Sequence, residues 1–171
     1  RMVFSKRGFL DTQEYLHCGW RILIGPKLKI KGSFFLEKDG VVCVIAGTCI
    51  VPKRTIQDSA QFILEEYLSN GKVDCSLLCG NFILIFIGPK GIEFQTDCSN
   101  GQHLYYHNEK EIWSDSQLTL VHALHDLDCP TAWNNESIEE ALITGCIVGK
   151  ETLFKDIFRQ KAEYCVFACP H

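Results

Sequence analysis

The segment 96–106, TDCSNGQHLYY, places an acidic side chain close to two phenols in the sequence. Asp97 is followed by turn-forming residues and then by Tyr105 and Tyr106. A carboxyl group near phenols is a candidate for general acid–base chemistry, in which a side chain gives a proton to a substrate or takes one from it. The same order suits a turn that ends one strand and begins another, because Asp, Asn, Gly and Ser favour turns. The segment therefore raises two hypotheses, a catalytic acid or a turn within a sheet.

Cysteines and histidines are the other side chains whose spacing could serve metal binding or nucleophilic chemistry. The chain has ten cysteines, and the apolar runs around Cys43, Cys146 and Cys165 indicate buried, reduced thiols rather than disulfides. Structural zinc sites use four ligands, in which paired cysteines or histidines are spaced more closely than in this sequence. We also find no serine or cysteine nucleophile that the sequence pairs with a base and a group to orient that base. The sequence thus predicts no metal site and no catalytic residue. The pairs that we interpret as core or surface residues are Cys75 with Cys79, Cys165 with Cys169, His103 with His107, and His122 with His125.

Composition indicates one globular domain over residues 1–171. Hydrophobic residues make up 46% of the 171 positions, which is enough for a sizeable core. The net charge is −4 and no long basic run occurs, so we expect no nucleic-acid partner. No apolar run reaches the roughly 18–20 residues that a membrane helix needs, and no signal peptide is visible. We therefore expect a cytoplasmic protein that does not enter a membrane.

The order of the expected elements is strands, a helix, a strand meander, two helices and a last strand. Alternation and β-branched residues mark the strands, and capping residues such as Thr55 and Ser137 mark helix starts. The apolar run at 81–87 predicts a strand buried on both faces, in one antiparallel unit with the next three strands. This order predicts an α+β fold with antiparallel sheets packed face to face and helices outside. The expected strands are 20–25, 27–38, 41–47, 81–87, 92–97, 103–107, 111–116 and 162–169, and the helices are 55–70, 116–126 and 137–146.

Several of these segments together resemble the glutamine amidotransferase domain of asparagine synthetase-like proteins. The resemblance covers about residues 40–165 and rests on the order and spacing of its parts. It implies the N-terminal-nucleophile fold, an αββα sandwich of two antiparallel sheets with outer helices. It also favours the second hypothesis for Asp97, a turn that is a signature of the fold. The matching residues are Gly80-Asn81-Phe82, Asp97, Leu104-Tyr105-Tyr106, Ser114-Asp115, the helix 58–71 and the segment 152–157.

The resemblance also implies where a glutamine pocket would lie, and the chain departs from the family there. Active members begin with a cysteine nucleophile, whereas this sequence begins Arg1-Met2. The family's Asn-Gly-Glu oxyanion segment corresponds to 46–48, Ala-Gly-Thr, which keeps Gly47 but loses an amide donor typically worth about 10²–10³ in rate. The family's Arg-Gly-Pro-Asp motif for the glutamine carboxylate is missing. Asp58 corresponds to the acid that holds the glutamine amino group, although a helix cap explains it equally well.

These departures predict a glutaminase-like domain without glutaminase activity, in a scaffold or interaction role, joined to an ATP-dependent amide ligase. Gly47 and Asp58 are then remnants of a pocket. One alternative is an active amidotransferase whose N-terminal cysteine was lost in cloning or processing. Another is a stand-alone small-molecule binding module that reuses the pocket, so the sequence leaves open whether the chain is an enzyme. We expect no cofactor in this domain, with ATP and Mg²⁺ in a synthetase domain absent here. The expected partner is that domain in cis or another protein, and a homodimer is also open.

Overall fold

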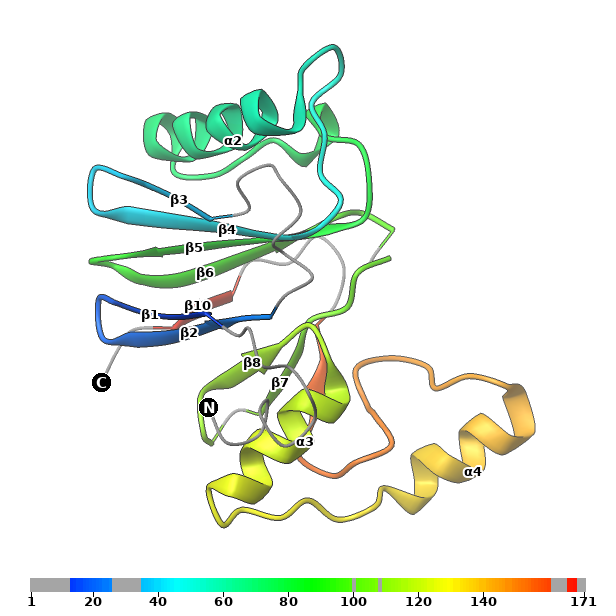
Figure 1. Ribbon diagram of the computed structural model, residues 1–171. Coiled ribbons are helices and arrows are strands. Elements are labelled where there is room, and N and C mark those ends of the chain that lie inside the picture. Colours follow the sequence, from blue (N-terminus) through cyan, green and yellow to red (C-terminus); the bar gives the residue numbers. More distant parts are fainter. Residues whose placement is uncertain (1–12, 26–34, 100, 108, 161–165, 169–171) are drawn as a thin grey trace. The chain divides into compact units, whose positions relative to one another are not determined.

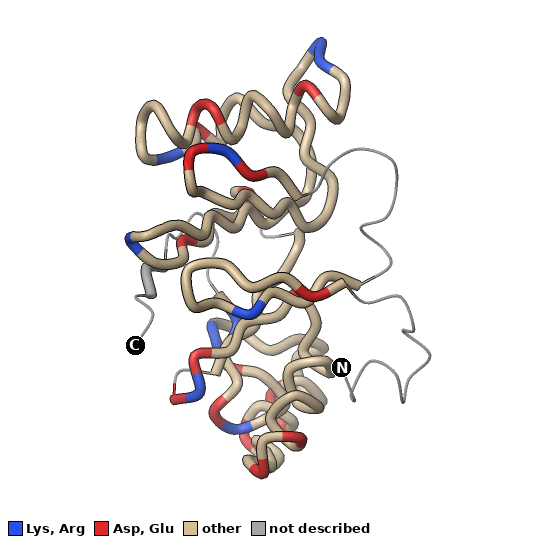
Figure 2. The backbone as a smooth tube through the Cα atoms, turned by 60° about the vertical axis from the view of Figure 1, so that its left-hand side comes forward, with Lys and Arg blue, Asp and Glu red and all other residues tan. Residues whose placement is uncertain are grey.

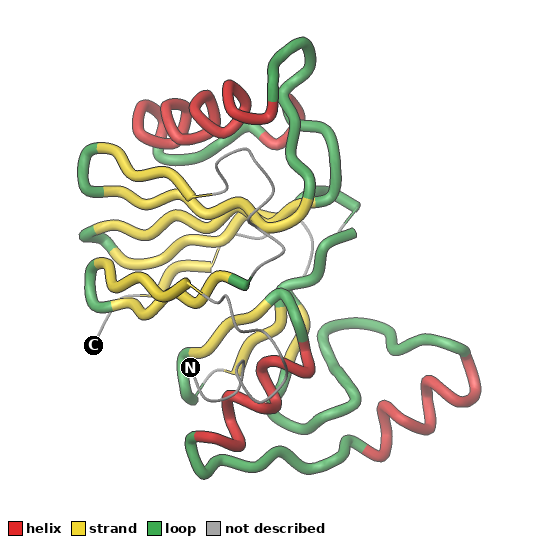
Figure 3. The backbone as a smooth tube through the Cα atoms, viewed as in Figure 1, coloured by secondary structure: helices red, strands yellow, loops and turns green. Residues whose placement is uncertain are grey.

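The computed structural model describes residues 13–25, 35–99, 101–107, 109–160 and 166–168. The chain divides into two compact units, Val3–Gln102 with Ala162–His171, and His103–Lys161 (Figure 1). The fold is α+β with antiparallel sheets, as the sequence predicts (Figure 3). The strands are β1 (Gln13–His17), β2 (Trp20–Ile24), β3 (Phe35–Lys38), β4 (Val41–Gly47), β5 (Phe82–Gly88), β6 (Gly91–Thr96), β7 (Tyr105–His107), β8 (Ile112–Ser114), β9 (Phe158–Arg159) and β10 (Val166–Ala168). The helices are α2 (Ile56–Asn70), α3 (Gln117–Asp126), α4 (Asn135–Thr144) and a 3-10 turn, η2 (Cys75–Leu77).

The first unit is built on a five-stranded antiparallel sheet in the order β10-β6-β5-β4-β3. The β3–β4 hairpin turns at Asp39 and Gly40, which both have positive φ angles of 52° and 73°. Two positive φ angles are what a tight two-residue hairpin requires, and an Asp-Gly pair adopts them at low cost. An Asp-Gly pair between the expected strands 27–38 and 41–47 predicts such a hairpin, and the structure confirms it. The predicted strand 27–38 is described from Phe35 onward, and its earlier residues lie outside the described part of the chain.

Helix α2 covers one face of this sheet (Figure 1). Residues paired across antiparallel strands share a face, so Leu36 and its partner Cys43 both point toward the helix. The ring of Tyr67 stacks on Phe86 with centroids 3.8 Å apart, and its hydroxyl donates to the carboxylate of Glu93 at 3.0 Å. The core between helix and sheet is formed by Cys43, Ile45, Cys49, Val51, Ala60, Ile63, Leu64, Val73, Leu78, Phe82, Leu84 and Phe86.

The β1–β2 hairpin contacts the opposite face of the sheet. Phe35 pairs with Val44, so both point away from α2, and the ring of Tyr15 stacks on Phe35 with centroids 4.1 Å apart. His17 Nε2 also lies 3.1 Å from the carbonyl of Gly40. Strand β5 is buried on both faces, with Ile83 and Leu84 fully inaccessible, which confirms the prediction from its continuous apolar run. Strand β1 was not predicted.

Helix α2 begins and ends where its sequence indicates. Thr55 caps the first turn, because its hydroxyl oxygen accepts the N–H of Asp58 at 3.1 Å. Gly71 ends the helix at a φ of 71°, and its N–H bonds to the carbonyl of Tyr67 at 2.7 Å. None of the helices in the described residues combines the length and apolar character needed to span a membrane.

The second unit has a three-stranded antiparallel sheet in the order β8-β7-β9, with helices α3 and α4. Its small core joins Leu120 and Leu124 of α3 to Ile157. The sequence predicted that strands 81–116 form one antiparallel unit, and this is wrong. Strands β5 and β6 belong to the first unit while β7 and β8 belong to the second, because β7 pairs with β8 and with the distant β9.

Helix α4 starts earlier and ends earlier than predicted. Asn134, rather than Ser137, is the N-cap, and its side-chain oxygen accepts the N–H of Ser137 at 3.4 Å. The prediction of Ser137 as the cap is therefore wrong, because Asn three residues earlier caps a helix as well as Ser does. Gly145 takes a φ of 80° and ends the helix before Cys146. Of the predicted last strand, the described part is β10.

Candidate functional site

The ends of β4 and β6 and the start of β5 meet at one edge of the five-stranded sheet. Gly47 pairs with Phe82, and the carbonyl of Phe82 accepts the N–H of Asp97 at 3.2 Å. Residues that are 35 and 15 positions apart in the sequence are thereby brought into one cluster, which we call the strand-end cluster (residues 46–49, 80–82, 97–99 and 101). This cluster contains Gly80-Asn81-Phe82 and Asp97, on which the family resemblance rests in part.

Asp97 holds the turn that follows β6. One carboxylate oxygen accepts the N–H of Phe82 at 3.0 Å, and the other accepts the N–H of Gly101 at 3.2 Å and the hydroxyl of Ser99. Burial raises the pKa of Asp97, but the hydrogen bonds from Ser99, Gly101, Phe82 and Gln102 outweigh burial and hold its pKa below the usual value. A carboxylate that several donors already occupy is a poor proton carrier. Its contacts are those of a structural anchor.

Three glycines allow the backbone to approach closely around Asn81. A Cβ atom on Gly47 would lie 2.3 Å from the carbonyl oxygen of Asn81, and one on Gly80 would lie 2.1 Å from that of Thr48. A Cβ atom on Gly101 would lie 2.5 Å from the side-chain carbonyl of Asn81. The N–H of Thr48 donates to the carbonyl of Asn81 at 2.8 Å, which locks the two strands together. Glycine is therefore required at Gly47 and Gly80 by packing and by their positive φ angles of 91° and 122°, and at Gly101 by packing alone.

The carboxamide of Asn81 is exposed yet fixed. The hydroxyl oxygen of Ser99 lies within hydrogen-bond distance of Asp97 and 3.3 Å from the side chain of Asn81. A hydroxyl has one proton, and the carboxylate of Asp97 is the stronger acceptor. The hydroxyl of Ser99 also faces the side-chain oxygen of Asn81, so it is shared between two acceptors, of which Asp97 is the closer. The chain Asn81–Ser99–Asp97 thus connects a surface amide to a buried anchor.

The two residues predicted to be pocket remnants have different surroundings. Along two antiparallel strands, residue pairs that exchange backbone hydrogen bonds alternate with pairs that do not. Backbone hydrogen bonds join Thr48 to Asn81 and Ile50 to Cys79, so the pairs at 47 and 49 are of the second kind. Gly47 therefore sits at a non-bonded position, and its N–H is directed away from β5. Asp58 lies in the first turn of α2, is exposed, and accepts the hydroxyl of Thr55 at 2.7 Å. Within the described part of the chain, no hydrogen bond or ion pair joins Asp58 to the strand-end cluster.

Ser59 links the segment after β4 to the helix, and sequence reasoning missed it. It is fully buried, its hydroxyl oxygen accepts the N–H of Val51 at 2.9 Å, and its hydroxyl donates to the carbonyl of Thr55 at 2.7 Å. A serine one turn into a helix that also carries the cap at Thr55 is the only local signal for such a role. Ser59 fixes how the chain leaves the strand-end cluster.

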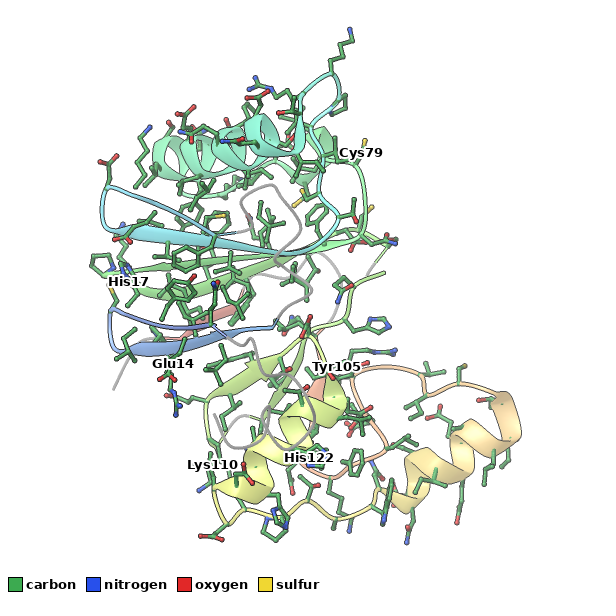
Figure 4. All side chains as sticks on the ribbon, in the orientation of Figure 1. Glu14, His17, Cys79, Tyr105, Lys110 and His122 are labelled. Atoms are coloured by element: carbon green, nitrogen blue, oxygen red, sulfur yellow. The ribbon has the colours of Figure 1, made fainter. Side chains whose placement is uncertain are left out.

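The described cysteines are all free thiols, and their burial differs from the prediction in part. Cys43 is buried as expected, whereas Cys79 and Cys146 are exposed, so the core interpretation of these two is wrong. Cys79 lies beyond the end of a strand pair (Figure 4), and Cys146 follows the glycine that ends α4. The apolar neighbours Leu77, Leu142 and Ile143 are themselves exposed, so apolar neighbours do not mark a core at either site. Cys165 and Cys169 lie outside the described residues.

Cys49 is one of the two thiols within the strand-end cluster, and it is a weak nucleophile. Burial raises its pKa to about 12, with smaller contributions from the nearby thiols Cys75 and Cys79 and from Asp97. Burial also raises the pKa of Cys43. Since the thiolate is the reactive form, neither group is activated for attack on a substrate.

Thiol labelling of the folded protein at pH 8 should separate these groups. We expect Cys79, Cys98 and Cys146 to react with a disulfide reagent within the first phase, since they are exposed. Cys43 and Cys49 should react slower by a factor of about 10² or more, because both access and thiolate fraction are low. Peptide mapping by mass spectrometry identifies each site, and labelling in urea gives the unprotected control. Fast labelling of Cys49 in the folded state would contradict its buried position.

The predicted histidine pairs do not converge on a common ligand position. His107 is buried, and its Nδ1 accepts the N–H of Lys110 at 3.3 Å. His125 is exposed on α3, with Nδ1 4.0 Å from the carboxylate of Asp126. Across the described ranges, no three His, Cys, Asp or Glu side chains form a group that could hold a metal ion.

Comparisons with known proteins found no family model, no curated protein and no solved structure that matches this chain. The class that the coordinates define is an α+β protein with antiparallel sheets and a glycine-rich strand-end cluster anchored by Asp97.

Proposed function

We propose that this chain is a glutaminase-like domain of an asparagine synthetase-related amide ligase, with an interaction role and without glutaminase activity. The observation that carries the family part is the contact of Asp97 with Phe82. The resemblance rests on the order of Gly80, Phe82 and Asp97 in the sequence, and these residues form one hydrogen-bonded cluster. The β5–β6 hairpin by itself places Phe82 opposite Asp97, but it does not require the carboxylate of Asp97 to accept the N–H of Phe82, and this additional contact supports the resemblance.

The layers of the first unit also support the proposed αββα sandwich. Helix α2, the five-stranded sheet and the β1–β2 hairpin follow one another in the order helix, sheet, strands. This is the order of the first three layers in such a sandwich.

The proposal includes a cytoplasmic location and a synthetase domain as the partner, which would supply ATP and Mg²⁺ chemistry.

The proposed lack of activity follows from the strand-end cluster. Ala46 is buried and has no side-chain donor, so a developing oxyanion next to Gly47 would lack the amide that active members use. Asp58 holds a helix cap and has no bond to that cluster. Because the amide donor is lost at Ala46 and Asp58 is engaged in the helix cap, we expect the site neither to bind the amino group of glutamine nor to polarise its side-chain amide.

Ammonia release from L-glutamine by the full chain tests this proposal. We expect release no faster than in buffer, and no change for Asp58→Asn. Glu65→Gln on the same helix is the matched control, since Glu65 is also an exposed acid in α2. Release well above buffer that falls at least tenfold in Asp58→Asn, but not in Glu65→Gln, would refute the proposal.

The N-terminal sequence of protein from its natural source shows whether a cysteine precedes or replaces Arg1, which is the condition for the active alternative.

A second candidate function, a small-molecule binding module, is favoured by the fixed carboxamide of Asn81. An exposed side chain held by Ser99 and packed on Gly101 is preorganised to bond a polar ligand. Titration calorimetry with L-glutamine and L-asparagine tests it, with Asn81→Asp as the variant that removes the amide donor. Heat of binding that disappears in this variant, with unchanged unfolding temperature, would favour the module over the scaffold role.

A further inference from the structure

Helix α4 exposes almost its whole length. Ser137 is its one buried residue, while Leu142 and Ile143 are 81% and 85% exposed. Large apolar side chains at such exposure on adjacent positions are unusual for a helix that is held only by its own unit. The helix has ten residues, and helices shorter than about 12–15 residues are marginal unless they pack on something.

Both ends of α4 are nevertheless firmly attached within the second unit. At its start, the N–H of Asn134 bonds to the carbonyl of Leu153 at 2.9 Å, and the Trp133 ring stacks on Phe154 with centroids 4.6 Å apart. Beyond its end, the guanidinium of Arg159 donates to the carbonyls of Ile147 and Gly149 at 3.2 and 2.8 Å. The chain therefore holds the helix at two points and leaves its outer face uncovered by the second unit (Figure 1).

The uncovered face has two chemically different halves. Glu136, Glu139, Leu142 and Ile143 are all exposed and recur at helical spacing, and together they form what we call the α4 patch. Its first half carries two carboxylates and its second half two large aliphatic side chains. The patch contains no Lys or Arg.

Charge decides which partner suits the α4 patch. Residues 103–161 contain ten Asp and Glu against five Lys and Arg, a net charge of −5, whereas the whole chain has −4. Figure 2 marks the charged positions along the described backbone. A second copy that docks through the same patch would set Glu136 and Glu139 against their own counterparts, and like charges across an interface oppose association. Anionic membrane surfaces are disfavoured for the same reason. A protein groove with an apolar floor and Lys or Arg at one end complements both halves.

We propose that the α4 patch docks into an apolar groove, rimmed by Lys or Arg, on a different protein. Leu142 and Ile143 fill the groove in the manner of an amphipathic helix, and Glu136 and Glu139 pair with the basic rim. This inference rests on the interaction role proposed above and does not depend on the state of the glutamine pocket. The ammonia assay tests the proposed lack of glutaminase activity, and the experiments below test docking, so either proposal can fail without the other.

Site-specific photo-crosslinking from position 143 of the full chain, in the cells that produce it, tests the proposal. We expect an adduct with another polypeptide, mapped by mass spectrometry to an apolar surface that contains Lys or Arg. Glu136→Lys with Glu139→Lys should reduce adduct yield at least fivefold, and Glu109→Lys, an exposed acid outside the patch, should not. An adduct between two copies, an adduct within one chain, or no adduct at all overturns the proposal.

Binding of the purified crosslinked partner gives the quantitative test. We expect Leu142→Ser with Ile143→Ser to weaken binding at least tenfold, as for central anchor residues of an interface. Leu118→Ser on α3 is the matched control, because Leu118 is also exposed, at 57%, and lies outside the patch. Added salt should weaken binding of the unchanged chain and have less effect on the double Lys variant. Unaltered affinity in the Ser variant, or equal loss in the Leu118 control, would overturn the proposal, and circular dichroism confirms that each variant is folded.

Discussion

Replacement of Gly80 by alanine should destabilise the first unit by about 4 kcal/mol, a large part of the roughly 5–15 kcal/mol that stabilises a typical domain. Gly80 has a φ of 122°, a conformation that L side chains rarely adopt and that costs about 1–3 kcal/mol. In addition, the new Cβ atom would lie 2.1 Å from the carbonyl oxygen of Thr48, so the backbone has to move. That movement costs a further 1–3 kcal/mol or so.

Urea unfolding with Gly40→Ala as the control measures this effect. Gly40 also has a positive φ, of 73°, but no atom lies within 4 Å of the position of its added Cβ. The control therefore carries only the conformational cost, about 1–2 kcal/mol. Equal losses in the two variants would show that the close approach of Gly80 to Thr48 contributes nothing, and would count against the strand-end cluster as described.

Replacement of Asp97 by asparagine should cost about 3 kcal/mol at pH 7, because one oxygen that accepts hydrogen bonds becomes an amide that cannot. In either orientation the new NH₂ group faces a donor, the N–H of Phe82 on one side or that of Gly101 on the other. Asp97 is buried, so water cannot replace the lost bond. Asp74→Asn is the matched control: Asp74 accepts the N–H of Ser76 at 3.0 Å in the same way but is exposed. It should cost less than about 1 kcal/mol, since water can satisfy the freed donor.

The difference between the unchanged chain and Asp97→Asn should shrink in acid. Burial opposes ionisation of Asp97, but its hydrogen bonds prevail and hold its pKa in the folded state below the ordinary 3.8. Its contribution to stability is therefore fully present above pH 3.8 and is lost as the pH falls through the folded pKa. Urea unfolding between pH 7 and pH 3 measures the gap between the two proteins. A gap that stays constant or widens below pH 4 would contradict the role of the ionised carboxylate.

Local patterns were sufficient for most of the elements. The Asp39-Gly40 pair, the Thr55 cap and the Asn70-Gly71 stop each act within a few residues, so their effect can be read directly from the sequence. The continuous apolar run of β5 predicted burial on both faces for the same reason, since every side chain in it is apolar. At α4 the local signal was misread: Ser137 was predicted as the cap, whereas Asn134 caps the helix.

The candidate site needed information that no local pattern carries. The sequence raised an acid and a turn as roles for Asp97, because it does not show which groups bond to the carboxylate. Those groups are the N–H of Phe82, 15 residues earlier, and the N–H of Gly101 in a turn whose closure the sequence does not specify. The exposure of Cys79 and Cys146 was also mispredicted, because apolar neighbours indicate a core only if something packs on both sides of the segment.

The sequence by itself determined the kind of most elements, the α+β class and the order of residues that resembles a glutaminase-like domain. Alternation with period two, helical spacing and turn residues all operate over short distances, so they survive without knowledge of the fold. Only the tertiary structure decided that β5–β6 and β7–β8 belong to different sheets, that Asp97 is an anchor, and that α4 faces outward. Each of these depends on which distant segments pair or pack, and long-range pairing is set by the sum of many contacts rather than by any one stretch of residues.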